Sequence, residues 1–259
     1  MPSPIQPGQT LLFLGDHTSP GDSAYVGVMG GIIARFYPDL RLNLLSSGSP
    51  GQTARGLRSP TLIEIIVSSK PDWLVIGIGL TDVMREPEVR NYLERAAQPP
   101  PRESAEAEAT FGPVMSMKGY RLAPVDDAGR EPDPIMRHLE DFAGDYRAAV
   151  TELRGAGVNC ALMTTVLVGN DPNTPVNRVL RAYNRAIRAA ALDSDALLID
   201  VEKACKNILD RAVNYKQQVA LASSTGRINP QGEALIARTT LNAFGLLPQP
   251  GQRPGTWSS

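Results

Sequence analysis

Short apolar runs alternate with amphipathic helical patterns along most of this chain, and this alternation restricts the possible folds more than any other feature. Five runs are typical of buried strands: Leu11–Leu14, Leu42–Leu45, Trp73–Ile78, Ala161–Val166 and Ala196–Ile199. Between them, apolar residues recur at the spacing of one helix face. Strands that alternate with helices in this way form a parallel sheet covered by helices. The sequence therefore predicts an α/β fold.

One long stretch interrupts the alternation. Residues 98–135 hold seven prolines and many charged residues between two regular elements. Connections of this length are uncommon, and they are usually functional or disordered. A surface insertion, a lid over a site and a flap for a protein partner are all compatible with this composition. We expect one domain over residues 1–247 with this insertion, followed by a flexible tail at 248–259 that is rich in Pro, Gly, Gln and Ser.

The charge balance and the apolar runs exclude several classes of partner. The chain has 26 basic and 27 acidic residues, so its net charge is −1, and no field draws it to nucleic acid or an anionic membrane. Its longest uncharged, largely apolar run, Ala24–Ala34, is shorter than the ~18 residues that a membrane-spanning helix needs. The first nine residues do not resemble a signal peptide. Cys160 and Cys205 form no disulfide framework. We expect a cytoplasmic protein without a membrane span, although a chain whose signal had been removed would look the same.

Several common catalytic and cofactor motifs are absent. The sequence contains no phosphate-binding P-loop, no Gly-x-Gly-x-x-Gly fingerprint, no Gly-x-Ser-x-Gly elbow and no His-Glu-x-x-His motif. His17 and His138 are the only histidines, and they are far apart in sequence. We therefore expect neither a cofactor nor a metal site.

Glycines and small polar residues follow three of the predicted strands. Gly15, Asp16 and His17 follow the first strand, Ser47–Gly51 follows the second, and Gly79–Asp82 follows the third. Ligands of open parallel sheets bind beyond the carboxyl ends of the strands. Glycines beside small polar residues leave backbone N–H groups free to point at a ligand there. These three segments are therefore expected to form the floor of a polar pocket.

At this point the chain resembles the SGNH, or GDSL-type, hydrolases over most of its length, apart from residues 98–135 and the tail. Four blocks carry the resemblance. They are Leu11–Thr18 for the strand that runs into Gly-Asp-Ser, Ser46–Thr53 for Asn-x-Gly-x-x-Gly-x-Thr, Lys70–Asp82 for the strand that ends in Gly-x-Asn-Asp, and Gly226–Gly232 for Asp-x-x-His-Pro. The resemblance implies a three-layer α/β/α sandwich, similar to flavodoxin, with a parallel five-stranded sheet in the order 2-1-3-4-5.

The departures from the family pattern decide what the resemblance implies about function. In this alignment the nucleophilic serine is replaced by His17, and the oxyanion-binding asparagine by Thr81. The aspartate and the histidine of the triad are replaced by Gly226 and Asn229. The glycine of the second block remains, as Gly51. No member of the Ser-His-Asp triad is present by this alignment.

Ser23 and His17 are the two candidates for a catalytic role by another route. Ser23 belongs to a Gly-Asp-Ser at residues 21–23, six residues after the Gly-Asp-His of the first block, and there it is a good N-cap for the first helix. His17 could act as a general base or nucleophile oriented by Asp16 or Asp82. We favour the cap for Ser23, and for His17 either a ligand contact or a ring that fills the former serine site.

The remaining candidates have simpler structural explanations. Asp16 and Asp82 lie at strand ends, where carboxylates often bind local backbone N–H groups. Asn229 directly precedes Pro230, which is typical of a helix N-cap.

The sequence therefore predicts a non-catalytic relative of the esterases that keeps a polar pocket made by Asp16, His17, Gly51, Thr81, Asp82 and Asn229. The expected occupant is a small polar ligand, an acyl or carbohydrate ester, or a protein partner. Two alternatives remain open. One is an active esterase or acetylhydrolase that uses a non-standard site around His17. The other is a scaffold or inactive subunit that binds a partner through residues 98–135.

Overall fold

Five parallel strands form the central sheet in the order β2-β1-β3-β4-β5, which confirms the expected topology. The structure is a computed structural model that describes residues 3–16, 24–48, 51–96, 134–214, 219–223, 226–248 and 250. The strand bounds are β1 Thr10–Gly15, β2 Asn43–Ser46, β3 Trp73–Gly77, β4 Asn159–Met163 and β5 Leu197–Ile199. Leu12 of β1 pairs with Leu45 of β2 on one side and with Leu74 of β3 on the other.

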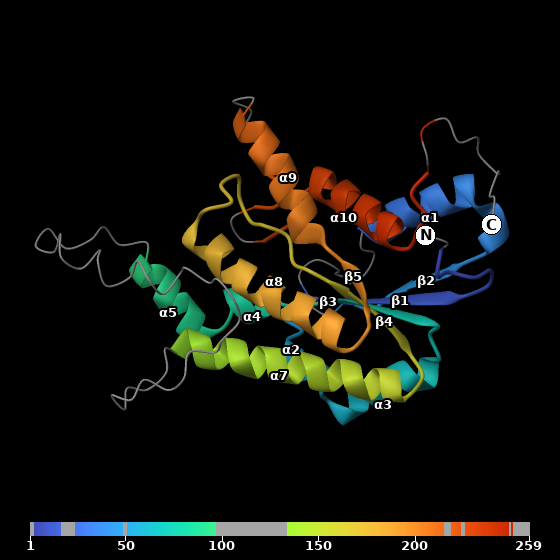
Figure 1. Cartoon of the computed structure of the whole chain (residues 1–259), viewed down its shortest axis with the longest axis horizontal. Coiled ribbons are helices and arrows are strands. Elements are labelled where there is room, and N and C mark those ends of the chain that lie inside the picture. Colours follow the sequence, from blue (N-terminus) through green and yellow to red (C-terminus); the bar gives the residue numbers. More distant parts are fainter. Residues whose placement is uncertain are drawn as a thin grey trace, which may run out of the picture.

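Helices cover both faces of this sheet, and the result is a three-layer α/β/α sandwich (Figure 1). Side chains of successive strand residues point to opposite faces, so Leu12 and Leu14 of β1 join one apolar layer while Leu11 and Phe13 join the other. The first layer packs under α7 and α8, and the second under α1, α9 and α10. The helix bounds are α1 Ala24–Phe36, the 3-10 helix η1 Pro38–Leu40, α2 Ala54–Leu57, α3 Pro60–Ser69, α4 Leu80–Met84, α5 Pro87–Ala96, α7 Pro134–Gly155, α8 Pro175–Asp193, α9 Val201–Asn214 and α10 Pro230–Ala243.

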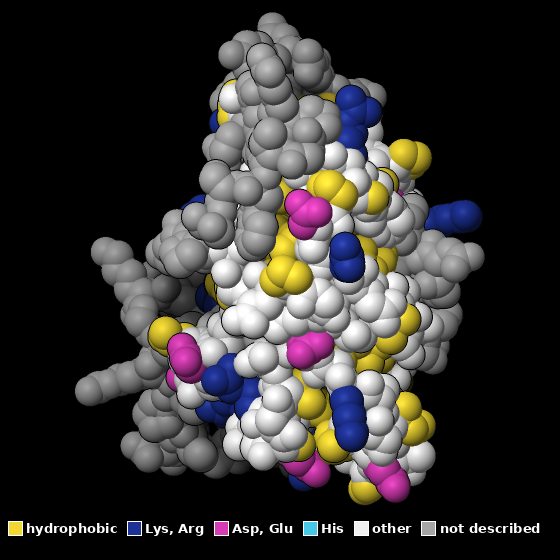
Figure 2. Space-filling model, turned by 90° about the vertical axis from the view of Figure 1, so that its right-hand side faces the viewer, with side chains coloured by type: hydrophobic (Ala, Val, Ile, Leu, Met, Phe, Trp, Pro, Cys, Tyr) yellow, Lys and Arg dark blue, Asp and Glu magenta, His cyan; other side chains and the backbone are white. Residues whose placement is uncertain are grey.

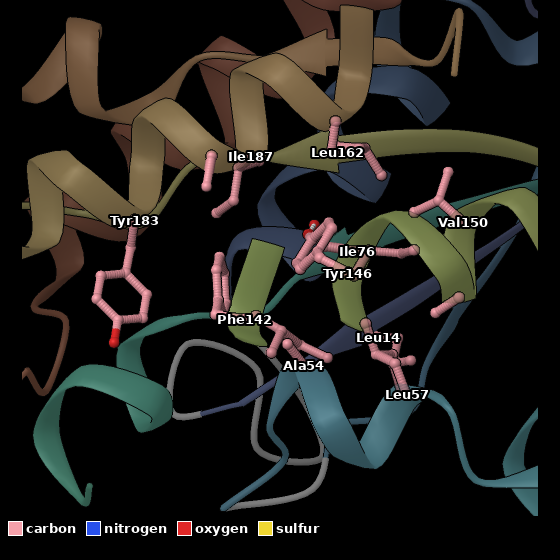
Figure 3. Close-up of a cluster of buried hydrophobic side chains, with 14 of the residues drawn as sticks. Leu14, Ala54, Leu57, Ile76, Phe142, Tyr146, Val150, Leu162, Tyr183 and Ile187 are labelled. Carbon is pink, nitrogen blue, oxygen red and sulfur yellow. Dashed lines mark hydrogen bonds between the residues drawn. The ribbon is translucent and has the colours of Figure 1, made fainter. Parts of the chain in front are cut away.

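Aromatic side chains from α7 and α8 meet in the first layer (Figure 3). The rings of Phe142 and Tyr183 lie 4.7 Å apart between centroids. Tyr146 is fully buried, and its hydroxyl donates a hydrogen bond to the Ile76 carbonyl at 3.2 Å. Buried aromatic pairs of this kind contribute stability beyond the area that they bury. They fix α7 against the end of β3, next to the polar edge of the sheet.

The fourth strand is shorter than the apolar run predicted. β4 ends at Met163, so residues 164–166 of the expected strand lie outside the sheet. The chain leaves because two buried asparagines of α8 hold the following loop. Asn184 accepts hydrogen bonds from the N–H and the hydroxyl of Thr165, at 2.7 and 3.0 Å. Asn177 accepts from the Val168 N–H at 2.9 Å and donates to its carbonyl at 2.8 Å.

The sequence analysis did not predict η1, α2, α4, α5 or α9. α2 and α4 have four and five residues, too few for a helical period to show in the sequence. α2 begins instead at a local signal, the N-cap Thr53, whose side chain accepts from the Gly56 N–H at 3.1 Å. α7 begins at Pro134, inside the last two positions of the predicted insertion. The rest of that insertion, up to residue 133, lies outside the described residues, as does most of the tail.

Acidic and basic side chains are interspersed on the face of the molecule that Figure 2 shows, in keeping with the net charge of −1. Hydrophobic side chains lie in small groups between them. No helix in the described part of the chain is both long and apolar enough to cross a membrane.

Candidate functional site

Asp16 organises the polar edge of the sheet, at the carboxyl ends of β1 and β3. Its side chain is fully buried, and its Oδ2 accepts hydrogen bonds from the N–H groups of Gly79 at 3.1 Å and Thr81 at 2.8 Å. Gly79 has a φ of 139°, a conformation that residues with a Cβ rarely adopt. The buried carboxylate thus holds the turn from β3 into α4, a segment distant in sequence rather than the local backbone that a strand-end aspartate was expected to bind.

Asp82 joins this turn to the loop that follows β2. Its two carboxyl oxygens lie 3.1 and 3.3 Å from the Ala54 nitrogen and accept its N–H, so α4 is tied to the start of α2. The pKa of Asp82 is raised to about 7, mainly by burial and to a lesser extent by the nearby Asp16 carboxylate, and the Ala54 N–H opposes this rise. Asp82 is therefore a carboxyl group that takes up its proton near neutral pH.

Gly51 lies directly beneath an arginine side chain. A Cβ at this position would stand 2.7 Å from Nη1 of Arg85, closer than real contacts allow. The φ of Gly51 is 93°, which also favours glycine. The second-block glycine therefore lets the Arg85 guanidinium approach the backbone of the loop before α2.

Asn229 is the N-cap of α10, as Asn before Pro predicts. Its Oδ1 accepts the Gly232 N–H at 2.9 Å, and its Nδ2 donates to the Ala220 carbonyl at 2.5 Å. Gly226, three residues earlier, has a φ of 82°, and a Cβ there would stand 2.7 Å from the Leu80 side chain. The last block thus lies against the start of α4.

These contacts bring four loops of the predicted site together. Asp16 bonds to Thr81, Asp82 bonds to the segment that starts at Gly51, and Gly226 lies against the residue before Thr81. The contacts given for Asn229 are those of a cap, with Ala220 and Gly232. The two catalytic candidates, His17 and Ser23, lie outside the described residues.

A polar cavity of about 870 Å³ adjoins these loops and is lined by residues of α2, α4 and the first half of α7. Thr81 and Asp82 line one side of it, and Arg137 and His138 of α7 line the other. Nε2 of His138 lies 3.6 Å from the Glu86 carboxylate. No residue of α7 is among the predicted site residues, because the sequence supports neither a metal-ligand nor a general-base role for His138. The polar spacing of His138, Asp141 and Asp145 along one helix face was the available signal.

Within the described ranges, no group of three or more His, Cys, Asp or Glu side chains is arranged to hold a metal ion.

Comparison with known families gives the family of the chain. Residues 13–219 match the model of the GDSL-like lipase/acylhydrolase family, which is well over half of the sequence. The chain belongs to this family. The match begins inside the first block described above, includes the second and third blocks, and ends before the Gly226–Gly232 block.

Relatives of this GDSL-like chain include an acetylxylan esterase of Geobacillus stearothermophilus. It is 23% identical over 258 residues, and the alignment covers 93% of this chain and 96% of the esterase. A crystal structure of that esterase matches with a TM-score of 0.66 at 21% identity, again covering 93% and 96% of the two chains. An alpha/beta hydrolase enzyme from the metagenome of Lake Arreo, Spain, matches with a TM-score of 0.65 at 19% identity, covering 95% and 99%. These structures share the fold of the GDSL-like chain.

Solved structures of the same esterase include three catalytic mutants. A serine, an aspartate and a histidine are each replaced by alanine in them, and the aspartate and histidine lie three positions apart. Such an Asp-x-x-His spacing is also that of the last family block.

Proposed function

We propose that this chain is a ligand-binding member of the GDSL-like family that does not hydrolyse esters through a serine triad. The observation that carries the proposal is the position of Asn229 and its hydrogen bonds. Asn229 stands where the resemblance to the family places the triad histidine. Its Oδ1 caps α10 by accepting the Gly232 N–H, and its Nδ2 donates to the Ala220 carbonyl. An amide neither takes nor releases a proton near neutral pH, so it cannot serve as the general base that a serine nucleophile requires.

The other triad positions support the same proposal. Gly226 stands where the aspartate is expected, and a carboxylate side chain there would meet Leu80. His17 stands where the serine is expected. In a triad enzyme of another fold, loss of the triad lowers turnover by about 10⁶-fold. Replacement of an oxyanion donor, here by Thr81, costs a further ~10²–10³-fold when the new side chain cannot take over.

The polar character of the cavity supports a role in binding. A site that has lost its function tends to drift toward residues that favour stability, and a relic would be expected to fill with apolar side chains. The cavity of about 870 Å³ is instead lined by Thr81, Asp82 and several charged residues. Its volume falls in the range of about 300–1,000 Å³ that is typical of small-molecule sites. Since relatives act on acetylated xylan, we propose a carbohydrate or carbohydrate ester as the ligand.

Hydrolysis of acyl or acetyl esters is the second candidate. The specific observation in its favour is the length of the similarity to an acetylxylan esterase, which covers 93% of this chain and 96% of the esterase. Such an activity would need a non-standard site around His17.

A thermal-shift titration with acetylated xylooligosaccharides tests the binding proposal. A ligand at about 100 times its Kd stabilises the folded state by about 2.7 kcal/mol, so the melting temperature should rise. The rise should disappear in Gly144→Trp, because Gly144 lines the cavity and a side chain added there meets nothing within 4 Å of its Cβ. Leu192→Trp is the matched control, because Leu192 is 83% exposed on α8, and it should keep the shift. Absence of any shift in the wild type, or an unchanged shift in Gly144→Trp, would contradict binding at this site.

A further inference from the structure

We propose that the cavity beside Gly51 binds a sugar acid, with its carboxylate held by Arg85 and Arg55. This inference rests on the proposed function, because it assigns a chemical class to the ligand of the same site. Nothing in the family comparison concerns a charged ligand. The inference comes from the distribution of charge around the cavity, from the position of one guanidinium, and from the size of the space.

The charges that line the cavity do not all neutralise one another. Arg58 is paired with Asp145 at 2.8 Å, and Glu86 lies 3.6 Å from His138. Asp82 is occupied by the Ala54 N–H. Among the described residues, no carboxylate forms an ion pair with Arg55 or Arg85, although both line the cavity. This wall therefore carries positive charge available to a ligand.

The position of Arg85 allows its guanidinium to contact a ligand in the cavity. Its Nη1 lies 2.7 Å from the position that a Cβ of residue 51 would occupy. The guanidinium therefore lies close to the backbone of Gly51. Arg85 directly follows α4, whose first turn is held by Asp16 through Thr81. Arg55 projects from α2, whose first N–H is bound by Asp82. Both arginines thus stand on backbone that the buried carboxylates fix.

The opposite wall carries carboxylates beside Arg137 and His138, and these carboxylates favour a hydroxylated ligand. Glu140 and Asp141 of α7 line the cavity from that side. Carboxylates repel an anion but accept hydrogen bonds from hydroxyl groups. A guanidinium presents a planar fork of donors that matches a carboxylate. A molecule with a carboxylate at one end and hydroxyls at the other fits both walls, and about 870 Å³ has room for a sugar ring, whereas a small inorganic anion would leave most of it empty.

Calorimetric titration of the full chain with D-glucuronate and D-glucose tests this inference, since the two probes differ only in the carboxylate. At low salt the wild type should bind glucuronate at least about tenfold more tightly than glucose, and Arg85→Gln or Arg55→Gln should remove about that factor. Glucose binding should stay unchanged in both variants. The control is Arg147→Gln, because Arg147 pairs with Asp193 outside the cavity and is 55% exposed. Added salt should weaken glucuronate binding.

Three results would overturn the inference. They are equal affinity for the two sugars, a preference for glucuronate that survives Arg85→Gln, and tighter binding of inorganic phosphate that competes with glucuronate. None of them bears on whether acetylated xylooligosaccharides bind or are hydrolysed, so the proposed function stands or fails separately. Unchanged melting temperatures of the unliganded variants would show that the fold is intact.

Discussion

Replacing Asp82 by asparagine should stabilise the protein above pH 7, by about 4 kcal/mol at most. The estimate follows from the pKa of Asp82, which burial raises from 3.8 to about 7 in the folded chain. Each pKa unit corresponds to about 1.4 kcal/mol. Asparagine keeps an oxygen that can accept the Ala54 N–H and never acquires a charge, so the variant avoids the cost of ionising a buried carboxyl group.

The sign of the pH dependence distinguishes this effect from an ordinary change in packing. Between pH 3.8 and about 7 the unfolded chain releases the Asp82 proton while the folded chain retains it, so the wild type loses stability as the pH rises. Above about pH 7 Asp82 is ionised in both states, so the stability no longer falls as the pH rises. The advantage of Asp82→Asn should therefore grow by about 2–3 kcal/mol between pH 5 and pH 8.

Urea denaturation of both proteins at these two pH values measures the difference. Asp210→Asn is the control, because Asp210 pairs with Lys206 on the surface of α9 and is 46% exposed. Its effect should be small at both pH values. A difference between Asp82→Asn and wild type that is the same at pH 5 and pH 8 would contradict the assignment of Asp82.

Asn177→Ala should lower the free energy of unfolding by about 3–5 kcal/mol, since it orphans several buried groups that cost about 1–3 kcal/mol each. The fully buried amide of Asn177 accepts the Val168 N–H and donates to the carbonyls of Val168 and Asp171. Removal of the amide takes away the hydrogen-bond partner of these backbone groups, and the loop after β4 would lose one of its attachments to α8.

Asn173→Ala is the matched control, in the same loop with an exposed side chain. It should change stability by less than about 0.5 kcal/mol. Chemical denaturation of both variants gives the two values. Similar stabilities for Asn177→Ala and Asn173→Ala would mean that the loop after β4 does not depend on the buried amide.

The sequence predicted those parts of the structure that local patterns determine. Apolar periodicity predicted the strands and the main helices, and the resemblance to the family implied the strand order, which the structure confirms. Asn229 before Pro230 predicted a helix cap, because capping depends on neighbouring residues alone. Asp16 and Asp82 were expected to bind local backbone N–H groups, and they bind instead the N–H groups of segments that are distant in sequence.

Other parts of the site depend on contacts between distant segments, and no local pattern reports these. The approach of Arg85 to Gly51 joins residues that are 34 positions apart in sequence. His138 lines the cavity only because Phe142 and Tyr146 pack α7 against β3 and α8. The end of β4 is likewise set by asparagines of the next helix. The apolar run continues to Val166, so it predicted a strand that ends three residues too late.

Turnover of p-nitrophenyl acetate, combined with labelling by a fluorophosphonate probe, tests most directly the claim that this fold binds rather than hydrolyses. The acetylxylan esterase of Geobacillus stearothermophilus serves as the positive control. We predict no labelling of this chain and no turnover above that of its His17→Ala variant. Labelling that disappears in Ser23→Ala would contradict the account by identifying Ser23, in the Gly-Asp-Ser at residues 21–23, as a nucleophile. Turnover that is lost in His17→Ala would contradict it by identifying a catalytic histidine.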